Sequence, residues 1–243
     1  MLAVQTKELT KKYKEKTAVD SLDLCVEQGE LFSLLGVNGA GKTTTVRMLC
    51  CLSEPTSGEA FVMGKNCKSE QAAVKSVIGI SPQDTAVAER LTVRENLVFM
   101  CRVYGFDAKK TEQRTNELIE TFAMQEVANS RAKTLSGGWK RKLSIAMALI
   151  GEPEVLFLDE PTLGLDVLAR RELWRAIEAL KGKITIILTT HYMEEAEQLS
   201  DRIAIMINGK IAALGTLAEI EQLSGAQGLE NAFVAIAEGG VQK

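Results

Sequence analysis

The 243-residue sequence predicts an α/β fold whose centre is a mainly parallel β-sheet. Short apolar runs at residues 155–158, 184–188 and 202–207 are separated by stretches with helical spacing. Such alternation is typical of parallel strands joined by right-handed crossovers. A glycine-rich segment, GVNGAGKTT at residues 36–44, lies between a further apolar run at residues 31–35 and a helical pattern over residues 44–52. The length is sufficient for one large α/β domain or two small ones.

The segment before the glycine-rich stretch predicts antiparallel strands. Polar and apolar side chains alternate over residues 19–26, the apolar ones being Val19, Leu22, Leu24 and Val26. This pattern is typical of strands with one buried and one solvated face. The sequence PTSG at residues 55–58 predicts a turn that leads into another strand at residues 59–63. We therefore expect an N-terminal antiparallel β subdomain.

Helical patterns then replace strands between about residues 84 and 150. They follow an apolar run at residues 77–81 that predicts a buried strand. Thr92 and Glu95 have the spacing of a capping box, and further helices are expected over residues 109–122 and from Ser136. We therefore expect an inserted α-helical subdomain, or helical lobe, at about residues 84–150.

The C-terminal part predicts a linker followed by a short tail. The linker is the glycine-containing segment at residues 224–228, and an amphipathic pattern begins at residue 229. We expect one domain over residues 1–228 and a short C-terminal tail over residues 229–243.

The glycine-rich segment has the composition and the context of a phosphate-binding loop (P-loop). Its glycines allow successive backbone N–H groups to point into one concavity, and the positive end of the next helix faces the same point. Lys42 can reach β- and γ-phosphate oxygens, and the Thr43 hydroxyl can bind Mg²⁺. An ordinary glycine turn is the alternative, but this pattern would arise by chance in roughly 1% of chains of this length. We predict a P-loop NTPase core whose nucleotide-binding residues are Gly36, Asn38, Gly39, Ala40, Gly41, Lys42, Thr43 and Thr44.

A pair of acids ends one of the predicted strands. Residues 155–160 read VLFLDE, so Asp159 and Glu160 lie at the carboxyl end of a buried strand, where open α/β sheets bind ligands. Asp159 is expected to hold Mg²⁺ through its water shell, and Glu160 to polarise an attacking water. The motif is weak when taken alone, because acids often cap a following helix.

Two glycines open another predicted helix, in the sequence LSGGW at residues 135–139. Ser136 is a potential N-cap, yet Gly137 and Gly138 each cost about 1 kcal/mol relative to alanine in a helix. An anion bound at the helix N-terminus would explain this composition. A flexible cap is the alternative.

In content, order and spacing these motifs resemble the ATP-binding cassette (ABC) family across nearly the whole chain. LSGGW is similar to its signature motif, VLFLDEP to its Walker B motif, and Gly-Leu-Asp ending at Asp166 to its D-loop. Gln83 matches the family's Q-loop glutamine, and His191 matches its switch histidine. Tyr13 matches the aromatic residue that stacks on adenine.

The resemblance implies a two-lobed cassette that binds ATP and Mg²⁺ and acts as a head-to-tail pair with a second ATPase protomer, as a homodimer when ATP is bound. The signature residues Ser136, Gly137 and Gly138 would bind the γ-phosphate held by the partner, and Asp166 would lie at the same interface. The residues implied to be catalytic are Gln83, Glu160 and His191. Those implied to hold the metal are Thr43, Gln83 and Asp159.

Three positions depart from the common pattern of the family. Trp139 occupies the last signature position, where a smaller or polar residue is usual. Met147 replaces a frequent arginine, and Val167 a frequent proline. None of the three changes removes a catalytic group.

The segment LTVRENLVFMCRVYGFD and the tail LENAFVAIAE resemble efflux-type cassettes, those of drug and sodium exporters and their lipid-moving relatives. In that subgroup the ATPase is often a separate polypeptide paired with a permease, whose coupling helix would contact the helical lobe and Gln83. We therefore expect an ATP-hydrolysing subunit that energises export through a separate membrane permease.

Composition argues against other partners and compartments. The net charge of −3 gives no electrostatic case for binding nucleic acid, which we do not expect as a partner. Five cysteines without a CxxC pair predict small core residues in a reducing compartment. Neither a signal peptide nor a membrane-spanning run is apparent, so we expect a cytoplasmic protein, peripheral on the cytoplasmic face of the membrane.

Two other functions remain open from the sequence. One is a soluble ABC ATPase acting on a nucleic-acid or ribosomal partner, but such proteins usually carry two fused cassettes or a long coiled-coil insertion. The other is a non-hydrolysing regulatory subunit, which typically lacks the catalytic glutamate or histidine. The chain has one cassette, and both Glu160 and His191 are present.

Overall fold

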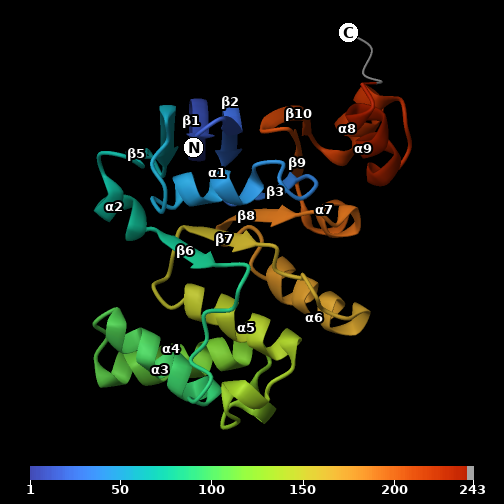
Figure 1. Cartoon of the computed structure of the whole chain (residues 1–243). Coiled ribbons are helices and arrows are strands. Elements are labelled where there is room, and N and C mark those ends of the chain that lie inside the picture. The colour runs from blue at the N-terminus through green and yellow to red at the C-terminus, as the bar shows by residue number, and fades with distance from the viewer. Residues whose placement is uncertain (240–243) are drawn as a thin grey trace.

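Two β-sheets organise the chain in the computed structural model, which describes residues 1–239 (Figure 1). The larger sheet has six strands in the order β10-β9-β3-β8-β7-β6. All its neighbouring pairs are parallel except β10 with β9. This arrangement confirms the mainly parallel sheet. Its strands are β3 (Leu31–Leu35), β6 (Ile78–Ser81), β7 (Val155–Asp159), β8 (Thr185–Thr190), β9 (Arg202–Ile207) and β10 (Lys210–Gly215).

The central strands of this sheet are covered on both faces. Every residue of β3, β7 and β8 is buried, as expected for parallel strands with layers on either side. Because these strands run in the same direction, their carboxyl ends lie along one edge of the sheet. The loops that follow β3, β6, β7 and β8 leave from this edge, and they carry the P-loop, Gln83, Glu160 and His191.

The second sheet is antiparallel, with the order β2-β1-β4-β5, and it confirms the predicted N-terminal subdomain. The predicted inward-facing residues of the segment 19–26 are all buried. Figure 1 shows helix α1 (Lys42–Leu49) between the two sheets. The strands are β1 (Leu2–Tyr13), β2 (Lys16–Glu27), β4 (Ser57–Val62) and β5 (Lys65–Asn66).

Helix α1 starts and ends earlier than the predicted range of residues 44–52. Gly41 adopts a left-handed conformation (φ 109°) and acts as the N-cap, so the first helical turn already contains Lys42. The helix ends at Leu49, and Cys51 two residues later also has positive φ (55°). Backbone conformations of this kind terminate helices.

The helical lobe lies on the other side of the parallel sheet, at the end of the molecule farthest from the antiparallel sheet (Figure 1). It contains α3 (Val93–Val103), α4 (Ala108–Thr121) and α5 (Gly137–Ala148). The predicted capping box is present, because Thr92 accepts from the Glu95 backbone N–H and Glu95 accepts from that of Thr92. Two short 3₁₀ turns, η1 (Gln125–Val127) and η2 (Ala132–Thr134), join α4 to α5.

The C-terminal segment packs on the edge of the parallel sheet rather than extending from it. Helix α8 (Leu217–Ser224) ends at Gly225, which has positive φ, and α9 (Leu229–Ala237) folds back against it. Leu229 and Ala232 are fully buried in a cluster with Leu35 and Ile205 of the sheet. Residues 240–243 of the predicted tail lie outside the described residues. The remaining helices are α2 (Gln71–Lys75), α6 (Val167–Glu178) and α7 (Met193–Leu199).

Three of the five cysteines behave as the predicted small core residues. Cys50, Cys67 and Cys101 are buried, Cys51 is half-buried, Cys25 is exposed, and all five thiols are free. Burial raises the pKa of the Cys67 thiol to about 12. No helix within residues 1–239 has the length and apolar character needed to cross a membrane.

The packing of α9 can be tested with a matched pair of substitutions. Leu229→Ala should lower the free energy of unfolding by about 2–5 kcal/mol, because it leaves a cavity at a fully buried position. Val234→Ala, on the exposed face of the same helix, should change that free energy by less than about 0.5 kcal/mol. Urea denaturation followed by circular dichroism measures both values. Equal effects of the two substitutions would show that α9 is not packed on the sheet.

Candidate functional site

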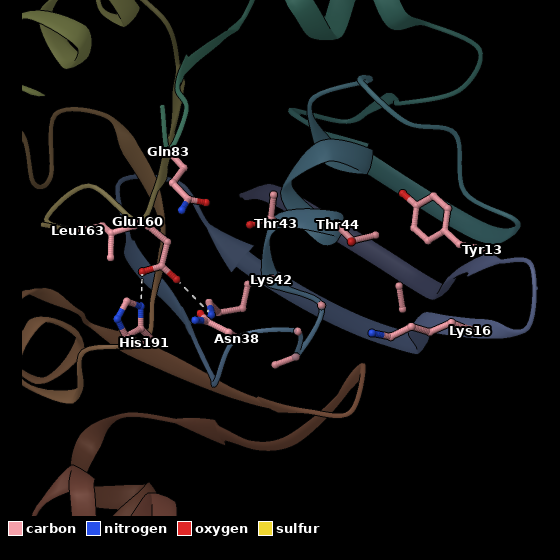
Figure 2. Close-up of a pocket in the computed structure, with 14 residues that line it drawn as sticks. Tyr13, Lys16, Asn38, Lys42, Thr43, Thr44, Gln83, Glu160, Leu163 and His191 are labelled. Atoms are coloured by element: carbon pink, nitrogen blue, oxygen red, sulfur yellow. Dashed lines mark hydrogen bonds and ion pairs between the residues drawn. The ribbon is translucent and has the colours of Figure 1, made fainter. Parts of the chain in front are cut away.

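A cavity of about 500 Å³ opens at the carboxyl edge of the parallel sheet, and loops from β3, β6, β7 and β8 surround it (Figure 2). The β1–β2 hairpin closes one side. Eleven of the predicted residues line this cavity: Tyr13, Asn38, Gly39, Ala40, Gly41, Lys42, Thr43, Thr44, Gln83, Glu160 and His191.

The P-loop forms the floor of the cavity because its glycines permit a tight path. Gly39 and Gly41 have φ values of 86° and 109°, a region that side chains disfavour. A Cβ at Gly41 would also lie 2.5 Å from the Ala18 carbonyl oxygen. The N-terminus of α1 points into the cavity, so its free N–H groups and its dipole favour an anion.

Gly36, which the sequence predicts to bind nucleotide, is not among the residues that line the cavity, and its role toward the nucleotide stays a prediction. It is buried beneath the loop, where a Cβ would lie 2.5 Å from the Met206 carbonyl oxygen of β9. Its own carbonyl oxygen accepts a hydrogen bond of 2.7 Å from Lys42 Nζ. Close backbone packing therefore requires glycine at position 36, and the backbone carbonyl of this residue holds the lysine.

The Lys42 ammonium group is buried at the base of the P-loop. Besides Gly36 it contacts the Val37 carbonyl oxygen at 3.3 Å and Glu160 Oε1 at 3.2 Å. The Lys42 side chain is only 5% exposed. A buried cation of this kind needs nearby negative charge, which Glu160 supplies here and phosphate oxygens can supply equally well.

Glu160 links the lysine to the histidine. Its second carboxylate oxygen, Oε2, lies 2.7 Å from His191 Nδ1, so that one carboxylate contacts both side chains (Figure 2). The Glu160 backbone has a φ of 49°, which is uncommon for a residue with a side chain. Strained residues of this kind cluster at active sites. Its backbone N–H is held by the carbonyl and the hydroxyl oxygen of Thr189.

Asp159 lies next to Thr43, just below the cavity. Thr43 Oγ1 donates to Asp159 Oδ1 at 3.1 Å, and the Thr189 hydroxyl donates to the same oxygen. A hydroxyl and a carboxylate oxygen are ligands that Mg²⁺ prefers, and this ion usually keeps several waters and binds phosphate oxygens as well. Within residues 1–239 no group of three or more His, Cys, Asp or Glu side chains is arranged to hold a metal. The two oxygens therefore fit a Mg²⁺ ion bound mainly by water and phosphate.

Three residues that line the cavity and one that supports it were not predicted. Lys16 pairs with Tyr13 across the β1–β2 turn, and Figure 2 shows its ammonium group on the side of the P-loop. Ala18 and Leu163 complete the lining, and Thr189 holds both acids from below. Only a prediction of the β1–β2 hairpin from the start of the sequence could have indicated that Lys16 lies beside Tyr13 at the cavity.

Tyr13 stands at the mouth of the cavity, with 47% of its surface exposed. The Lys11 ammonium lies 5.0 Å from its ring centroid. An exposed aromatic ring beside a phosphate-binding loop is free to stack on a planar base.

The predicted signature and D-loop residues lie outside this cavity. The Ser136 side chain caps α5 by accepting from the Trp139 backbone N–H at 3.4 Å, and Gly137 and Gly138 form the first helical positions. Asp166 caps α6, accepting from the N–H groups of residues 168 and 169. These residues therefore do not take part in the nucleotide cavity of their own chain.

The fold and the cavity together define a P-loop nucleoside triphosphatase. A comparison with protein-family models matches residues 19–163 to the ABC transporter family. The chain belongs to the ABC transporter family, and it is an ATP-binding ATPase of that family.

Individual relatives support this assignment over most of the chain. The chain is 42% identical over 224 residues to the daunorubicin/doxorubicin resistance ATP-binding protein DrrA of Streptomyces peucetius, covering 92% of this chain and 68% of that protein. It is 41% identical over 214 residues to the probable multidrug ABC transporter ATP-binding protein YbhF of Escherichia coli strain K12. That match covers 88% of this chain but only 37% of YbhF.

A solved structure has the same fold. It is the dimeric structure of a post-hydrolysis state of the ATP-binding cassette MJ0796 bound to ADP and Pi. The TM-score is 0.79 at 25% sequence identity, with 88% of this chain and 98% of that chain covered.

The support that Thr189 gives to the two acids can be tested on β8 itself. Thr189→Val removes the hydroxyl that bonds Asp159 and the Glu160 backbone, so turnover of ATP should fall about 10- to 100-fold. Thr189→Ser should keep most of the activity. Thr185→Val removes a hydroxyl that accepts from the Gly29 N–H at the opposite end of the strand, and should leave turnover per folded molecule unchanged. Equal turnover by the Thr189→Val variant and the parent would exclude this role.

Proposed function

We propose that the chain hydrolyses ATP to energise export of a substrate through a separate membrane permease, on the cytoplasmic face of the membrane. The observation that carries the hydrolytic part is the chain of contacts Lys42–Glu160–His191 at the edge of the parallel sheet. The names of DrrA and YbhF, which concern drug resistance and multidrug transport, support the export part.

In the proposed mechanism the chain binds the triphosphate with main-chain amides and one cation. The N–H groups of the P-loop and of the first turn of α1 surround the β-phosphate, and Lys42 reaches the γ-phosphate. Tyr13 stacks on the adenine ring. When bound, Mg²⁺ neutralises charge on the phosphate oxygens, with Thr43, Asp159 and Gln83 as its protein neighbours.

The proposed reaction is an in-line attack of water on the γ-phosphorus, which forms a bond to the water oxygen and breaks the bond to the β–γ bridging oxygen, so that ADP leaves and phosphate is formed. Glu160 accepts the proton of this water, and the lysine contact is exchanged for contact with phosphate. His191 fixes the direction of the carboxylate through its 2.7 Å contact, and its other ring nitrogen would contact the γ-phosphate of the bound nucleotide. Strain at the Glu160 backbone helps to hold the carboxylate at one orientation.

The proposed active form is a head-to-tail pair of chains. Ser136, Gly137 and Gly138 lie at the N-terminus of α5, where N–H groups favour an anion, yet they do not line the cavity of their own chain. In a pair they would contact the γ-phosphate bound by the partner. The dimeric state of the solved cassette supports this arrangement.

The proposed permease contact is an apolar hollow beside Gln83. It has a volume of about 330 Å³ and is formed by the end of α1, the strand β6 with Pro82, and the helices α3 and α5. Leu52 and Tyr104 line it and remain 56% and 45% exposed. An exposed apolar hollow suits an amphipathic helix, which the permease would supply.

Glu160→Gln is the direct test of the proposed base. The amide keeps the shape of the side chain but cannot accept the proton, so turnover should fall by about 10²–10⁴ while ATP binding remains. The variant should accumulate as an ATP-bound dimer in size-exclusion chromatography. Glu197→Gln, an exposed residue of α7, is the control. Parent-like hydrolysis by the Glu160→Gln variant would show that another group is the base.

The permease contact can be tested by placing a charge in the hollow. Leu52→Glu should abolish co-purification of the chain with its permease from solubilised membranes, because a carboxylate would be buried against an apolar helix. The variant should unfold at the same temperature as the parent. Val234→Glu introduces the same charge on α9, at a position that is 47% exposed, and should co-purify normally. Retention of the Leu52→Glu variant by the permease would rule out this surface.

A further inference from the structure

Helix α5 is packed in register against β6 and the residues that follow this strand. At one end of the contact, Gly79 has no space for a side chain, because a Cβ would lie 2.3 Å from the Ala148 carbonyl oxygen. One turn toward the helix N-terminus, Ser144 Oγ lies 2.9 Å from Ser81 Oγ. One further turn toward the helix N-terminus, Arg141 contacts the residues that follow β6. The helix and the strand therefore share three successive contacts.

Arg141 makes the contact nearest to the nucleotide cavity. Its guanidinium group donates 2.7 Å and 2.6 Å hydrogen bonds to the backbone carbonyl oxygens of Pro82 and Gln83. The residue is only 4% exposed. The planar group thus holds two successive peptide units of the Gln83 segment in a fixed orientation.

The environment of Arg141 is unusual for a buried cation. Within residues 1–239 it forms no ion pair, and its hydrogen-bond acceptors are the two carbonyl oxygens. Burial lowers the pKa of the Arg141 guanidinium below its usual range. The carboxylates of Asp159, Asp84 and Glu195 oppose this effect of burial without forming an ion pair with Arg141. The direct contacts of the buried charge are thus the two carbonyl oxygens, so the position of Arg141 is tied to that of the Gln83 segment.

The two ends of this contact belong to different catalytic sites in the proposed dimer. Gln83 lines the nucleotide cavity of its own chain. Arg141 follows Gly138 by three residues on the same helix, about 4.5 Å along its axis. Gly138 belongs to the signature segment, which would contact the nucleotide bound by the partner. One rigid helix therefore connects the Gln83 segment of one site to the signature of the other.

We propose that Arg141 is a positioning residue that couples the two nucleotide sites of the dimer by holding the Gln83 segment to the signature helix. This inference rests on the proposed head-to-tail arrangement. When nucleotide draws Gln83 toward the cavity, Arg141 carries the N-terminus of α5 with it. The signature that the chain presents to its partner then changes position, and the second site responds to occupancy of the first.

The test compares two neighbouring cations of α5. Arg141→Lys keeps the positive charge but loses the planar guanidinium group, whose two nitrogens donate to two carbonyl oxygens. Lys140→Ala is the control, because Lys140 also reaches the segment after Gln83 but does so through a partly exposed ion pair with Glu89 (3.1 Å).

Three measurements are made on each variant. Steady-state turnover is measured as a function of Mg-ATP concentration. The fluorescence emission of Trp139, which adjoins Gly138, reports changes in the environment of the signature. A Trp139→Phe variant shows how much of the total tryptophan emission comes from this residue. Binding of a fluorescent ATP analogue reports the P-loop.

For the Arg141→Lys variant we expect kcat to fall about 10- to 100-fold, while KM for ATP stays within about twofold of the parent value. The coupling predicts a sigmoidal dependence of turnover on ATP concentration in the parent, and this dependence should become hyperbolic in the variant. The change in Trp139 emission on nucleotide binding should disappear. The Lys140→Ala variant should match the parent in all these measurements. A sigmoidal response and a full Trp139 signal in Arg141→Lys would overturn the inference.

A measurement on the parent chain keeps the inference testable if the variant does not fold. Amide hydrogen exchange should show that ATP changes protection in residues 82–85 and 136–140 together. A change confined to residues 82–85 would overturn the coupling. Failure of the proposed function looks different, because the parent would then lack ATP turnover or would show turnover per chain that is independent of protein concentration.

Discussion

The placement of one buried ammonium group, that of Lys42, determines much of the architecture around the nucleotide cavity. A buried cation needs negative or carbonyl oxygens on all sides. The P-loop supplies two carbonyl oxygens and Glu160 supplies a carboxylate. Glu160 can reach this point only because β7 ends on the same edge of the sheet as β3, with β8 alone between the two strands. The burial of the Lys42 charge therefore depends on the strand order, which brings Glu160 within reach of it.

The support beneath the charged groups is provided by close backbone packing rather than by additional ionic groups. Gly36 and Gly41 are each so near to another backbone segment that a side chain would collide with it. Thr189 uses a single hydroxyl to accept from the Glu160 backbone and to donate to Asp159. Such neutral hydrogen bonds orient both acids without neutralising either, so their charges remain available to a metal and to a water molecule.

Features with a local cause were predictable from the sequence. The P-loop, the acids after β7 and the capping box at Thr92 are each recognisable within a few residues. Features that arise from tertiary approach were not. The need for glycine at position 36 comes from Met206 on another strand, and the role of Thr189 comes from the acids on β7. Lys16 reaches the cavity only because the β1–β2 hairpin folds over it. The roles of Tyr13, Gln83, His191 and the signature residues follow from family resemblance and from position, and remain predictions.

The absence of a side chain at Gly79 has a mechanical consequence. The Ala148 end of α5 lies directly against the bare main chain of Gly79, which holds this end of the helix close to β6. A rotation of the helix relative to the sheet would therefore pivot at this contact. Ten residues separate Ala148 from Gly138, which gives a lever arm of about 15 Å. A tilt of about 4° at this pivot then displaces the far tip by about 1 Å. A small rotation of α5 would thus move the signature residues at its N-terminus by a distance large enough to make or break a hydrogen bond to a phosphate oxygen.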